Sequence, residues 1–330
     1  MAALLAITPA PAATAPAELK ASDYAGAGTL VRLNSGRALD IRCIGTGYPT
    51  VILTAGAGEQ SLTWRSLQSE LAKTTHVCAW DRAGFGFSDP SPEIQDTEHT
   101  TRDLEAILSG AKISPPYVLV GHSLGSYETL MFSFHHAKEV AGVVLIDPSA
   151  PFQTQRLKAA APATYAVIDG YQQKQVADLK SCIGWLGEKA NDSLVAANCI
   201  SPPDPAYPES LQHAVAQWEH NAAAQKNVLS LLESIFNGRD SQELKASWKH
   251  LDAMPLIVLT AGAPPPVPLQ GEAKMQLPKL QSEWSKMHDE IAALSTHGTN
   301  RVVSGATHYI YLDRPAVVLA TVREVLAGIN

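Results

Sequence analysis

The chain has 330 residues and a formal net charge of −7, and 45% of its residues are hydrophobic and 17% charged. This balance is typical of a globular protein, long enough for one large α/β domain with an inserted subdomain. The negative charge disfavours binding to nucleic acid or anionic membranes, and no run approaches the roughly 18 apolar residues that span a bilayer.

The chain begins with a short apolar stretch, residues 1–7, followed by an Ala/Pro/Thr tract that ends at Ala17. Ala-x-Ala sequences in this tract are typical of signal-peptide cleavage sites, although no Lys or Arg precedes Lys20. We interpret residues 1–22 as a signal-like or disordered segment and expect a secreted or periplasmic protein. A plain flexible tail on a cytoplasmic protein is the alternative.

The next part of the chain alternates apolar runs with helical patterns. The predicted elements are, in chain order, a β-hairpin at 28–45, a strand at 49–54, a helix at 61–73, a strand at 76–81, a helix at 100–111, a strand at 116–120, a helix at 124–137 and a strand at 140–146. This alternation predicts a mostly parallel sheet that is covered by helices on both faces.

Residues 151–250 break the alternation, because they are helix-rich and contain few strand-like runs. We interpret them as a helical cap inserted into an α/β core of residues 23–150 and 251–330. The α/β pattern resumes with a strand at 255–260, a proline-rich loop at 263–268, a further helical pattern, a last strand at 301–303 and a closing helix at 315–327.

Four cysteines carry information through their positions. Cys182 and Cys199 flank a short polar stretch, and Cys43 and Cys78 lie in two predicted strands. An even count beside a signal-like segment suggests the disulfides Cys182–Cys199 and Cys43–Cys78, with buried free thiols as the alternative. Since the chain shows neither a Cys-x-x-Cys spacing nor a phosphate-binding loop sequence, we predict no metal and no cofactor.

The most informative stretch is Gly121-His122-Ser123-Leu124-Gly125, which follows an apolar strand and precedes a helical pattern. A serine at a tight strand-to-helix turn projects its hydroxyl above the sheet, and flanking glycines let the turn close. The backbone N–H of Leu124 faces the same space, at a helix N-terminus that favours negative charge. Ser123 is therefore the predicted nucleophile of an acyl transfer, rather than an ordinary serine in a glycine-rich turn.

A serine hydroxyl needs a base to take its proton, and His308 is the best candidate among the 11 histidines. It lies just beyond the last predicted strand, in a loop that contains glycine. A solvated loop residue is the alternative interpretation. His122 adjoins the nucleophile and is assigned to packing or substrate-side hydrogen bonding, and His135 and His136 are expected to be structural.

Four segments together resemble the α/β-hydrolase-fold serine hydrolases, namely residues 55–58, 81–89, 121–125 and 304–308. The resemblance covers about residues 30–330 and implies an eight-stranded, mostly parallel sheet with a helical cap. It also implies the chain order nucleophile, acid, histidine. The usual strand order of this family makes the segments that hold Cys43 and Cys78 neighbours, which supports that disulfide.

The resemblance most often places the acid after the strand at 255–260, but the following loop here contains no carboxylate until Glu272. We therefore predict Asp147, at the other location that some members of the family use. The alternative role for Asp147 is a strand-end cap, and Glu272 and Asp252 are the fallback acids. The acid orients the imidazole and stabilises its charged form.

The resemblance also implies that the oxyanion donors are the backbone N–H groups of Ala57 and Leu124. Ala55-Gly56 stands where the family usually has His-Gly, so Ala57 is identified by its position after the strand. Asp81 and Arg82 are expected to brace loops beneath the site.

These residues predict a serine hydrolase that cleaves esters or lactones, with a small-molecule ester-type substrate. Peptidases, C–C hydrolases and perhydrolases share the same serine chemistry, whereas the epoxide hydrolases and haloalkane dehalogenases of this fold use aspartate in place of Ser123. A rival class is an NAD-dependent oxidoreductase, because residues 56–61 followed by Asp81 imitate a dinucleotide fingerprint. That interpretation leaves Ser123 and His308 unexplained, as does a non-catalytic binding protein. The sequence does not indicate the oligomeric state.

Overall fold

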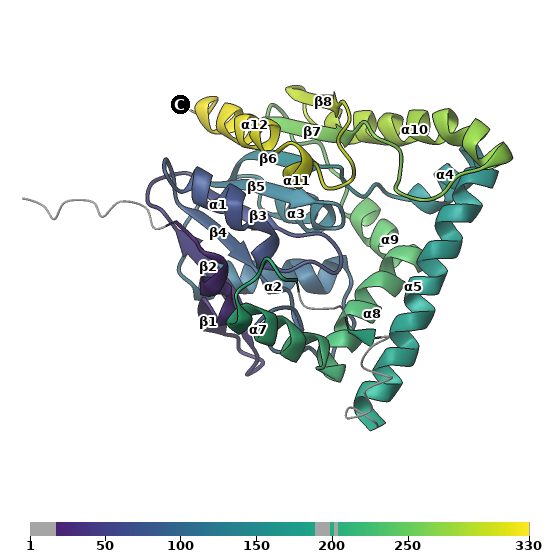
Figure 1. Cartoon of the computed structure of the whole chain (residues 1–330). Helices are drawn as coiled ribbons and strands as arrows, with labels where there is room; N and C mark the ends of the chain where they lie inside the picture. Colours follow the sequence, from purple (N-terminus) through teal and green to yellow (C-terminus); the bar gives the residue numbers. More distant parts are fainter. Residues whose placement is uncertain (1–17, 189–198, 201–203, 330) are drawn as a thin grey trace, which may run out of the picture.

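The computed structural model describes residues 18–188, 199–200 and 204–329. Its strands form one eight-stranded sheet in the order β1-β2-β4-β3-β5-β6-β7-β8 (Figure 1). The pairs β1–β2 and β2–β4 are antiparallel and all other pairs are parallel, which confirms the predicted fold class. The strands are β1 (Thr29–Arg32), β2 (Ala38–Ile44), β3 (Thr50–Thr54), β4 (Val77–Trp80), β5 (Tyr117–His122), β6 (Val140–Ile146), β7 (Leu256–Ala261) and β8 (Gly298–Val303).

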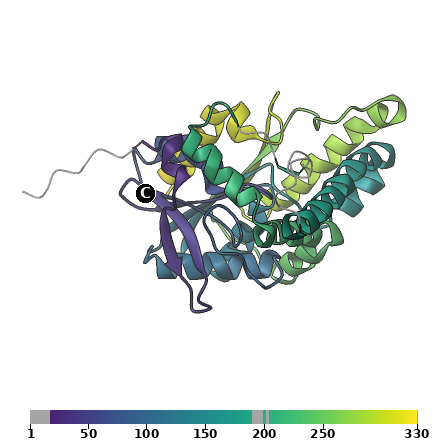
Figure 2. The ribbon, with the colours of Figure 1, turned by 60° about the horizontal axis from the view of Figure 1, so that its bottom comes forward.

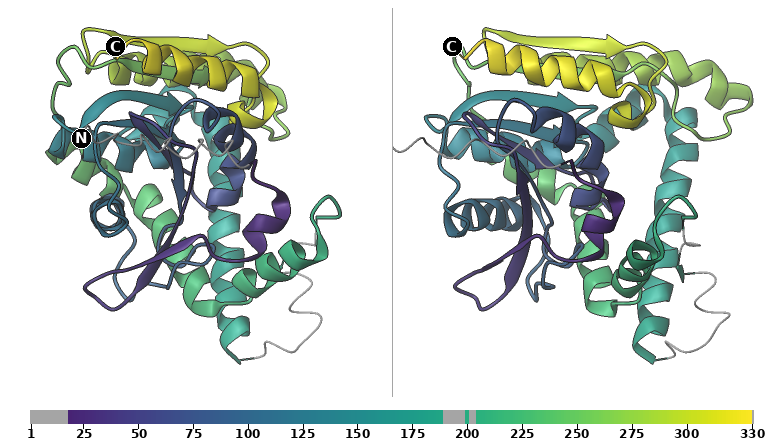
Figure 3. Two further views of the ribbon diagram at one scale, coloured as in Figure 1. Left: turned by 90° about the vertical axis from the view of Figure 1, so that its left-hand side faces the viewer. Right: turned by 60° about the vertical axis from the view of Figure 1, so that its left-hand side comes forward.

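Helices cover both faces of this sheet, as the views in Figure 3 show. The helices of the α/β core are the 3-10 helices η1 (Ala21–Ala25) and η2 (Ser61–Trp64), and α1 (Arg65–Leu71), α2 (Thr97–Gly110), α3 (Gly125–His135), α10 (Gly271–Ala292), α11 (Ile310–Asp313) and α12 (Pro315–Ala327).

Between β6 and β7, the regular elements of the described residues are all helices. They are α4 (Gln153–Ala160), α5 (Pro162–Glu188), α7 (Glu209–Glu219), α8 (Ala222–Asn237) and α9 (Arg239–Ala246). The longest, α5, packs on α4, α8 and α10 and runs along the side of the molecule toward which the parallel strands point (Figures 1 and 2). The boundaries of the cap at residues 151–250 stay a prediction. Of the described helices, none is long and apolar enough to cross a membrane.

Alternate residues of the central strands enter two different cores, because successive side chains of a strand point to opposite faces. In β3, Ile52 packs into the core formed with α2, α3 and α10, while Val51 and Leu53 pack into the core formed with α1 and α12. Strands that are buried on both faces consist of continuous apolar runs, which explains why the sequence revealed them.

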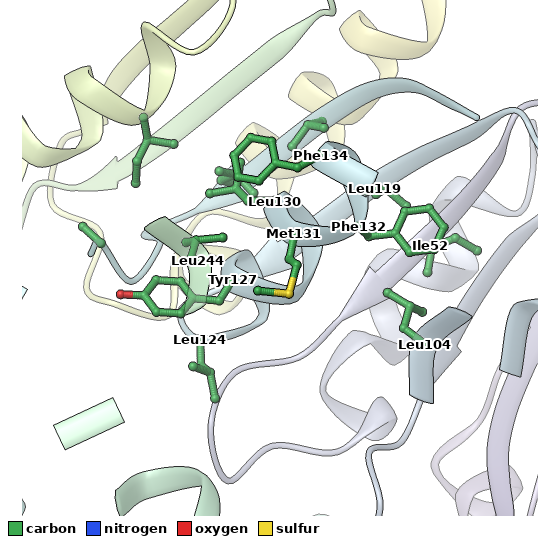
Figure 4. Packing of buried hydrophobic residues seen from close by; sticks show 14 of the residues in the cluster. Ile52, Leu104, Leu119, Leu124, Tyr127, Leu130, Met131, Phe132, Phe134 and Leu244 are labelled. Atoms are coloured by element: carbon green, nitrogen blue, oxygen red, sulfur yellow. The ribbon is translucent and has the colours of Figure 1, made fainter. Parts of the chain in front are cut away.

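Helix α3 lies at the centre of the first core. Its buried residues Tyr127, Leu130, Met131, Phe132 and Phe134 pack between the sheet and the helices α2 and α9, as Figure 4 shows together with Ile52, Leu104, Leu119, Leu124 and Leu244. Because α3 is buried on nearly all sides, the turn that precedes it has a rigid support.

Both predicted disulfides are present. Cys43 and Cys78 are directly paired positions on the antiparallel strands β2 and β4, and Cys182 on α5 is bonded to Cys199. Cys43, Cys78 and His76 are the one group of potential metal ligands that lie close together in the described part of the chain. Since both sulfurs of this group belong to a disulfide, they are not available as thiolate ligands in this state.

The segment before β1 joins the fold earlier than the sequence predicts. The N–H of Leu19 donates to Oγ of Ser69 (3.1 Å), and Leu19 and Tyr24 are buried against Leu211 of α7. The packed part of the chain therefore begins before residue 22. The signal-like features of residues 1–17 lie outside the described residues.

Candidate active site

Ser123 lies in the turn between β5 and α3. Its φ of +51° is in the left-handed region, which is unfavourable for a residue with a side chain. The N–H of Ser123 donates to the carbonyl of Ile146 on β6 (3.0 Å), so the turn is anchored to the neighbouring strand. Backbone strain of this kind concentrates at functional positions, and a strand–turn–helix is the context that the Gly-x-Ser-x-Gly pattern requires.

The two glycines around Ser123 allow close backbone contacts. A Cβ atom at Gly125 would lie 2.5 Å from the carbonyl oxygen of Thr54 and 2.6 Å from that of Ala55. A Cβ atom at Gly121 would lie 2.6 Å from the carbonyl oxygen of Gly125. These are backbone atoms that cannot move aside easily, so glycine is required for α3 to approach β3 and close the turn.

Asp147 follows β6, the strand next to the one that carries Ser123, and has a φ of +40°. Its Oδ2 lies 2.6 Å from Nδ1 of His308, and its Oδ1 accepts hydrogen bonds from the N–H of Ala261 and from Nε1 of Trp284, both at 2.9 Å. The Asp147 side chain is buried, and both of its oxygens have partners. The carboxylate is therefore fixed in one direction, with one oxygen facing the imidazole.

The contact between Asp147 and His308 controls the protonation of both groups. Burial alone would raise the pKa of Asp147, but the hydrogen bond and the charge of His308 outweigh it and lower that pKa below its usual value. Burial alone would lower the pKa of His308, but the hydrogen bond and the charge of Asp147 raise it above its usual value. The pair is thus built to stabilise a charged imidazole.

The fallback acids lie elsewhere. Glu272 is on α10, where its Oε1 accepts a hydrogen bond from Gln276 of the same helix. Asp252 contributes its backbone carbonyl to contacts with Ser295 and Thr296. Within the described ranges, Asp147 is the one carboxylate that is hydrogen-bonded to His308.

His308 lies at the end of the loop that follows β8. The N–H and the hydroxyl of Thr307 both donate to Oδ2 of Asp313 at 2.6 Å, which holds the residue before it in place. The ring of His308 lies beside the ring of His122, with 4.6 Å between centroids. His122 directly precedes Ser123, and because Asp147 holds Nδ1 of His308, Nε2 is the ring nitrogen of His308 that does not face the carboxylate.

Arg82 braces the loop after β3, as expected. Its Nη2 and Nη1 donate to the carbonyls of Ala55 (2.6 Å) and Gly56 (3.1 Å), and its guanidinium also binds the carboxylate of Glu128 on α3 at 2.6 and 3.0 Å. The side chains of Arg82 and Glu128 are only 3% and 1% exposed. This buried pair fixes the backbone that carries the Ala57 N–H against the helix that carries the Leu124 N–H.

Arg82→Met is expected to reduce the free energy of unfolding by about 3–5 kcal/mol, because it leaves the Glu128 carboxylate buried without its partner. Arg301→Met is the matched control, since its ion pair with Glu324 is largely exposed and is expected to contribute about 0–1 kcal/mol. Urea unfolding of both variants measures the difference. Equal losses would contradict the bracing role of Arg82.

Sequence reasoning missed three side chains around the site, namely Trp284, Glu59 and Tyr311. Trp284 is 137 positions from Asp147, and nothing in the sequence marks it as a partner. Glu59 belongs to the dinucleotide-like pattern and was not predicted as part of the site. A carboxylate directly after a glycine-rich loop is nevertheless a sequence feature that could have indicated a side chain of the site. Tyr311, three residues after His308, donates a hydrogen bond to Glu59.

The dinucleotide-like pattern has a structural role instead. Oδ1 of Asp81 accepts a hydrogen bond from the N–H of Ser61 (2.6 Å), and Oδ2 accepts one from the Ser61 hydroxyl (3.1 Å). Asp81 is buried, which raises its pKa. Its carboxylate therefore ties the end of β4 to the start of η2 rather than facing a ribose.

A mostly parallel sheet with a strained serine after β5 and a His–Asp pair after β8 and β6 defines an α/β protein of the hydrolase type. Residues 51–321 match the model of the family described as Alpha/beta hydrolase family, and the chain belongs to that family.

Known relatives and solved structures agree with this fold. Uncharacterized protein YqjL of Bacillus subtilis (strain 168) is 24% identical over 281 residues, which cover 85% of each chain. A thermophilic esterase from Thermogutta terrifontis aligns with a TM-score of 0.57 at 19% identity, over 92% of this chain and 99% of that one. The epoxide hydrolase CorEH aligns with a TM-score of 0.61 at 15% identity, over 92% and 99%. At such identities the solved structures bear on the fold alone.

Proposed function

We propose that the protein is a serine hydrolase that cleaves carboxylic esters or lactones. In this proposal Ser123 is the nucleophile, His308 the general base and Asp147 the acid that orients it. One observation carries the proposal: His308, whose Nδ1 lies 2.6 Å from Oδ2 of Asp147, packs with its ring 4.6 Å from that of His122, the residue before a serine held at a φ of +51°.

The reaction proceeds in two halves. Nε2 of His308 takes the proton of the Ser123 hydroxyl while Oγ forms a bond to the carbonyl carbon of the ester. The proton then passes to the leaving oxygen as the ester C–O bond breaks, which leaves an acyl-enzyme. Water repeats the sequence with His308 as its base and releases the acid. Asp147 stays ionised throughout and stabilises the imidazolium.

The negative oxygen of each tetrahedral intermediate requires hydrogen-bond donors. The N–H groups of Ala57 and Leu124 are the proposed donors, and neither has an acceptor among the hydrogen bonds of the described residues. Leu124 lies at the N-terminus of α3, where the helix dipole favours negative charge. One such donor typically contributes ~2.7–4 kcal/mol of transition-state stabilisation.

Hydrolysis of p-nitrophenyl esters of increasing acyl length tests this function, together with labelling by a fluorophosphonate that reacts with activated serines. We expect turnover and labelling of Ser123, and the best acyl length gives the reach of the acyl site. The absence of turnover with every ester and lactone, together with the absence of labelling, would reject the proposal.

The N-terminal pattern and the two disulfides also support our proposal of a secreted or periplasmic location, which cell fractionation tests.

The rate is expected to depend on pH through His308. A general base must be neutral, so kcat/KM should fall as the pH drops through the pKa of His308. Because that pKa is raised, the midpoint should lie above about 6.5, the ordinary value of histidine. A pH profile of ester hydrolysis gives the midpoint, and a rate that is flat down to about pH 5 would contradict His308 as the base.

A further inference from the structure

A second carboxylate–histidine pair lies beside the proposed triad. Oε2 of Glu59 is 2.8 Å from Nδ1 of His122, and Nε2 of His122 is 3.0 Å from the backbone carbonyl oxygen of His308. The side chains of His122 and Glu59 are 1% and 14% exposed. The ring of His122, the residue before Ser123, therefore bridges the loop after β3 and the loop after β8.

The partners of His122 determine how many protons it carries. A carboxylate and a carbonyl oxygen both accept hydrogen bonds, whereas a neutral imidazole has one N–H and can donate to only one of them. Burial would raise the pKa of Glu59, but the hydrogen bond and charge of His122 and the hydrogen bond of Tyr311 bring it to about 2. Both ring nitrogens of His122 therefore face hydrogen-bond acceptors, and only a ring that is protonated on both nitrogens can donate to both of them.

Glu59 also holds both sides of the reaction centre. Its Oε2 accepts a second hydrogen bond from the N–H of Gly56 (2.6 Å), one residue before the proposed oxyanion donor Ala57. Its Oε1 accepts a hydrogen bond from the hydroxyl of Tyr311, three residues after His308. One carboxylate thus contacts the oxyanion loop, the nucleophile turn through His122 and the chain beyond the proposed base.

The packing around this pair leaves no room for a side chain on the loop. A Cβ atom at Gly56 would lie 2.6 Å from Oε2 of Glu59 and 2.8 Å from Nδ1 of His122. The aromatic rings of Tyr311 and Tyr309 lie 5.0 and 5.7 Å from the His122 ring and enclose it with His308. Glycine at position 56 is therefore what allows the carboxylate, the imidazole ring and the backbone to converge.

We propose that Glu59 and His122 are positioning residues. Their buried ion pair holds the loop after β3, which carries Ala57, and the loop after β8, which carries His308, at fixed positions around Ser123. This inference rests on the proposed function. The pair does not exchange protons with the substrate, and it acts by fixing the distances between the groups that do. Misplacement of reacting groups by about 1 Å can lower a rate 10²-fold, so the loss of the pair should appear in kcat.

Glu59→Gln tests the charge of the pair at nearly constant shape. With its oxygen at the position of Oε2, the amide can still accept from the N–H of Gly56 and from an Nδ1–H of a neutral His122, while its NH2 faces the hydroxyl of Tyr311. These contacts can therefore persist while the ion pair is lost. We expect kcat for a p-nitrophenyl ester to fall about tenfold or more, with KM changed by less than about twofold. Glu105→Gln is the matched control, since it neutralises a carboxylate paired with His136 (2.9 Å) on another part of the molecule. It should leave kcat unchanged.

Nitrogen-15 NMR of the histidine rings provides a second readout that does not depend on activity. His122→Asn identifies the His122 signals by their disappearance. We expect both ring nitrogens to carry protons at neutral pH in the wild type and only one of them in Glu59→Gln. An unprotonated His122 nitrogen in the wild type would overturn the inference, as would an unchanged kcat in Glu59→Gln.

Two further results separate a failed inference from other failures. If Glu59→Gln does not fold, as judged by circular dichroism, Tyr311→Phe removes one donor from Glu59 and should lower kcat to a smaller extent; an unchanged kcat would then count against the inference. If the wild type shows no Ser123-dependent hydrolysis, the proposed function fails, whereas the NMR result still decides whether the ion pair exists.

Discussion

Ser123→Ala is expected to lower kcat/KM for p-nitrophenyl esters by at least about 10⁴-fold, without loss of the fold. Alanine has no oxygen to attack the carbonyl, and the remaining donors and base can act only on water. The positive φ of Ser123 disfavours alanine as much as serine, so the turn should be equally strained in both proteins. Initial rates and circular dichroism of the purified variant provide the test.

Ser149→Ala is the control for this variant. Ser149 contacts Ser123 through its backbone, where its N–H donates to the Ser123 carbonyl (2.9 Å), and alanine preserves that hydrogen bond. We expect its rate to stay within about twofold of the wild type. Full activity of Ser123→Ala, or an equal loss in both variants, would place the nucleophile elsewhere.

Asp147→Asn is expected to lower kcat by about 10⁴-fold. The reason lies in the two hydrogen bonds that Oδ1 of Asp147 accepts from Ala261 and Trp284. These donors require an oxygen, so the new amide nitrogen must take the position of Oδ2 and direct its N–H at Nδ1 of His308. His308 is then held with its proton on Nε2, the nitrogen that has to accept the serine proton.

Glu272→Gln is the comparison, because the hydrogen bond that Glu272 makes in the described residues is to Gln276 of its own helix, and its loss should change kcat by less than about twofold. Steady-state kinetics of both variants at saturating ester give the ranking. A larger loss in Glu272→Gln than in Asp147→Asn would transfer the role of the acid to Glu272.

The sequence predicted the parts of the site that depend on local structure. The turn at Ser123 is set by its own glycines and by the strand and helix around it, so a short pattern was sufficient. Asp147 was predicted as the acid by a different route, because the loop after β7 contained no carboxylate and the end of β6 did. The sheet could equally be predicted from the sequence, since strands buried on both faces are continuous apolar runs.

The remaining parts depend on contacts between distant segments. Trp284 reaches Asp147 from α10, and Glu59 meets Tyr311 across 252 positions of the chain. Such pairs are determined by how helices and loops pack, and no local periodicity encodes them. The same limit applies to residues 151–250, where the composition indicated helices but not the single helix of 27 residues that forms α5.

The position of Asp147 after β6 has a consequence for how this protein could change its substrates. The resemblance to related hydrolases would place the acid after β7, where a change in loop length would displace the catalytic machinery. Here the loop at residues 262–270 carries none of the proposed reacting groups, and the hydrogen bond between this region and Asp147 comes from the N–H of Ala261 at the base of the loop. Gly262 and Ala263 donate backbone hydrogen bonds to the chain before His308, so it is the part of this loop after Ala263 that can diverge, or be exchanged in the laboratory, while the proposed reaction centre is inherited intact.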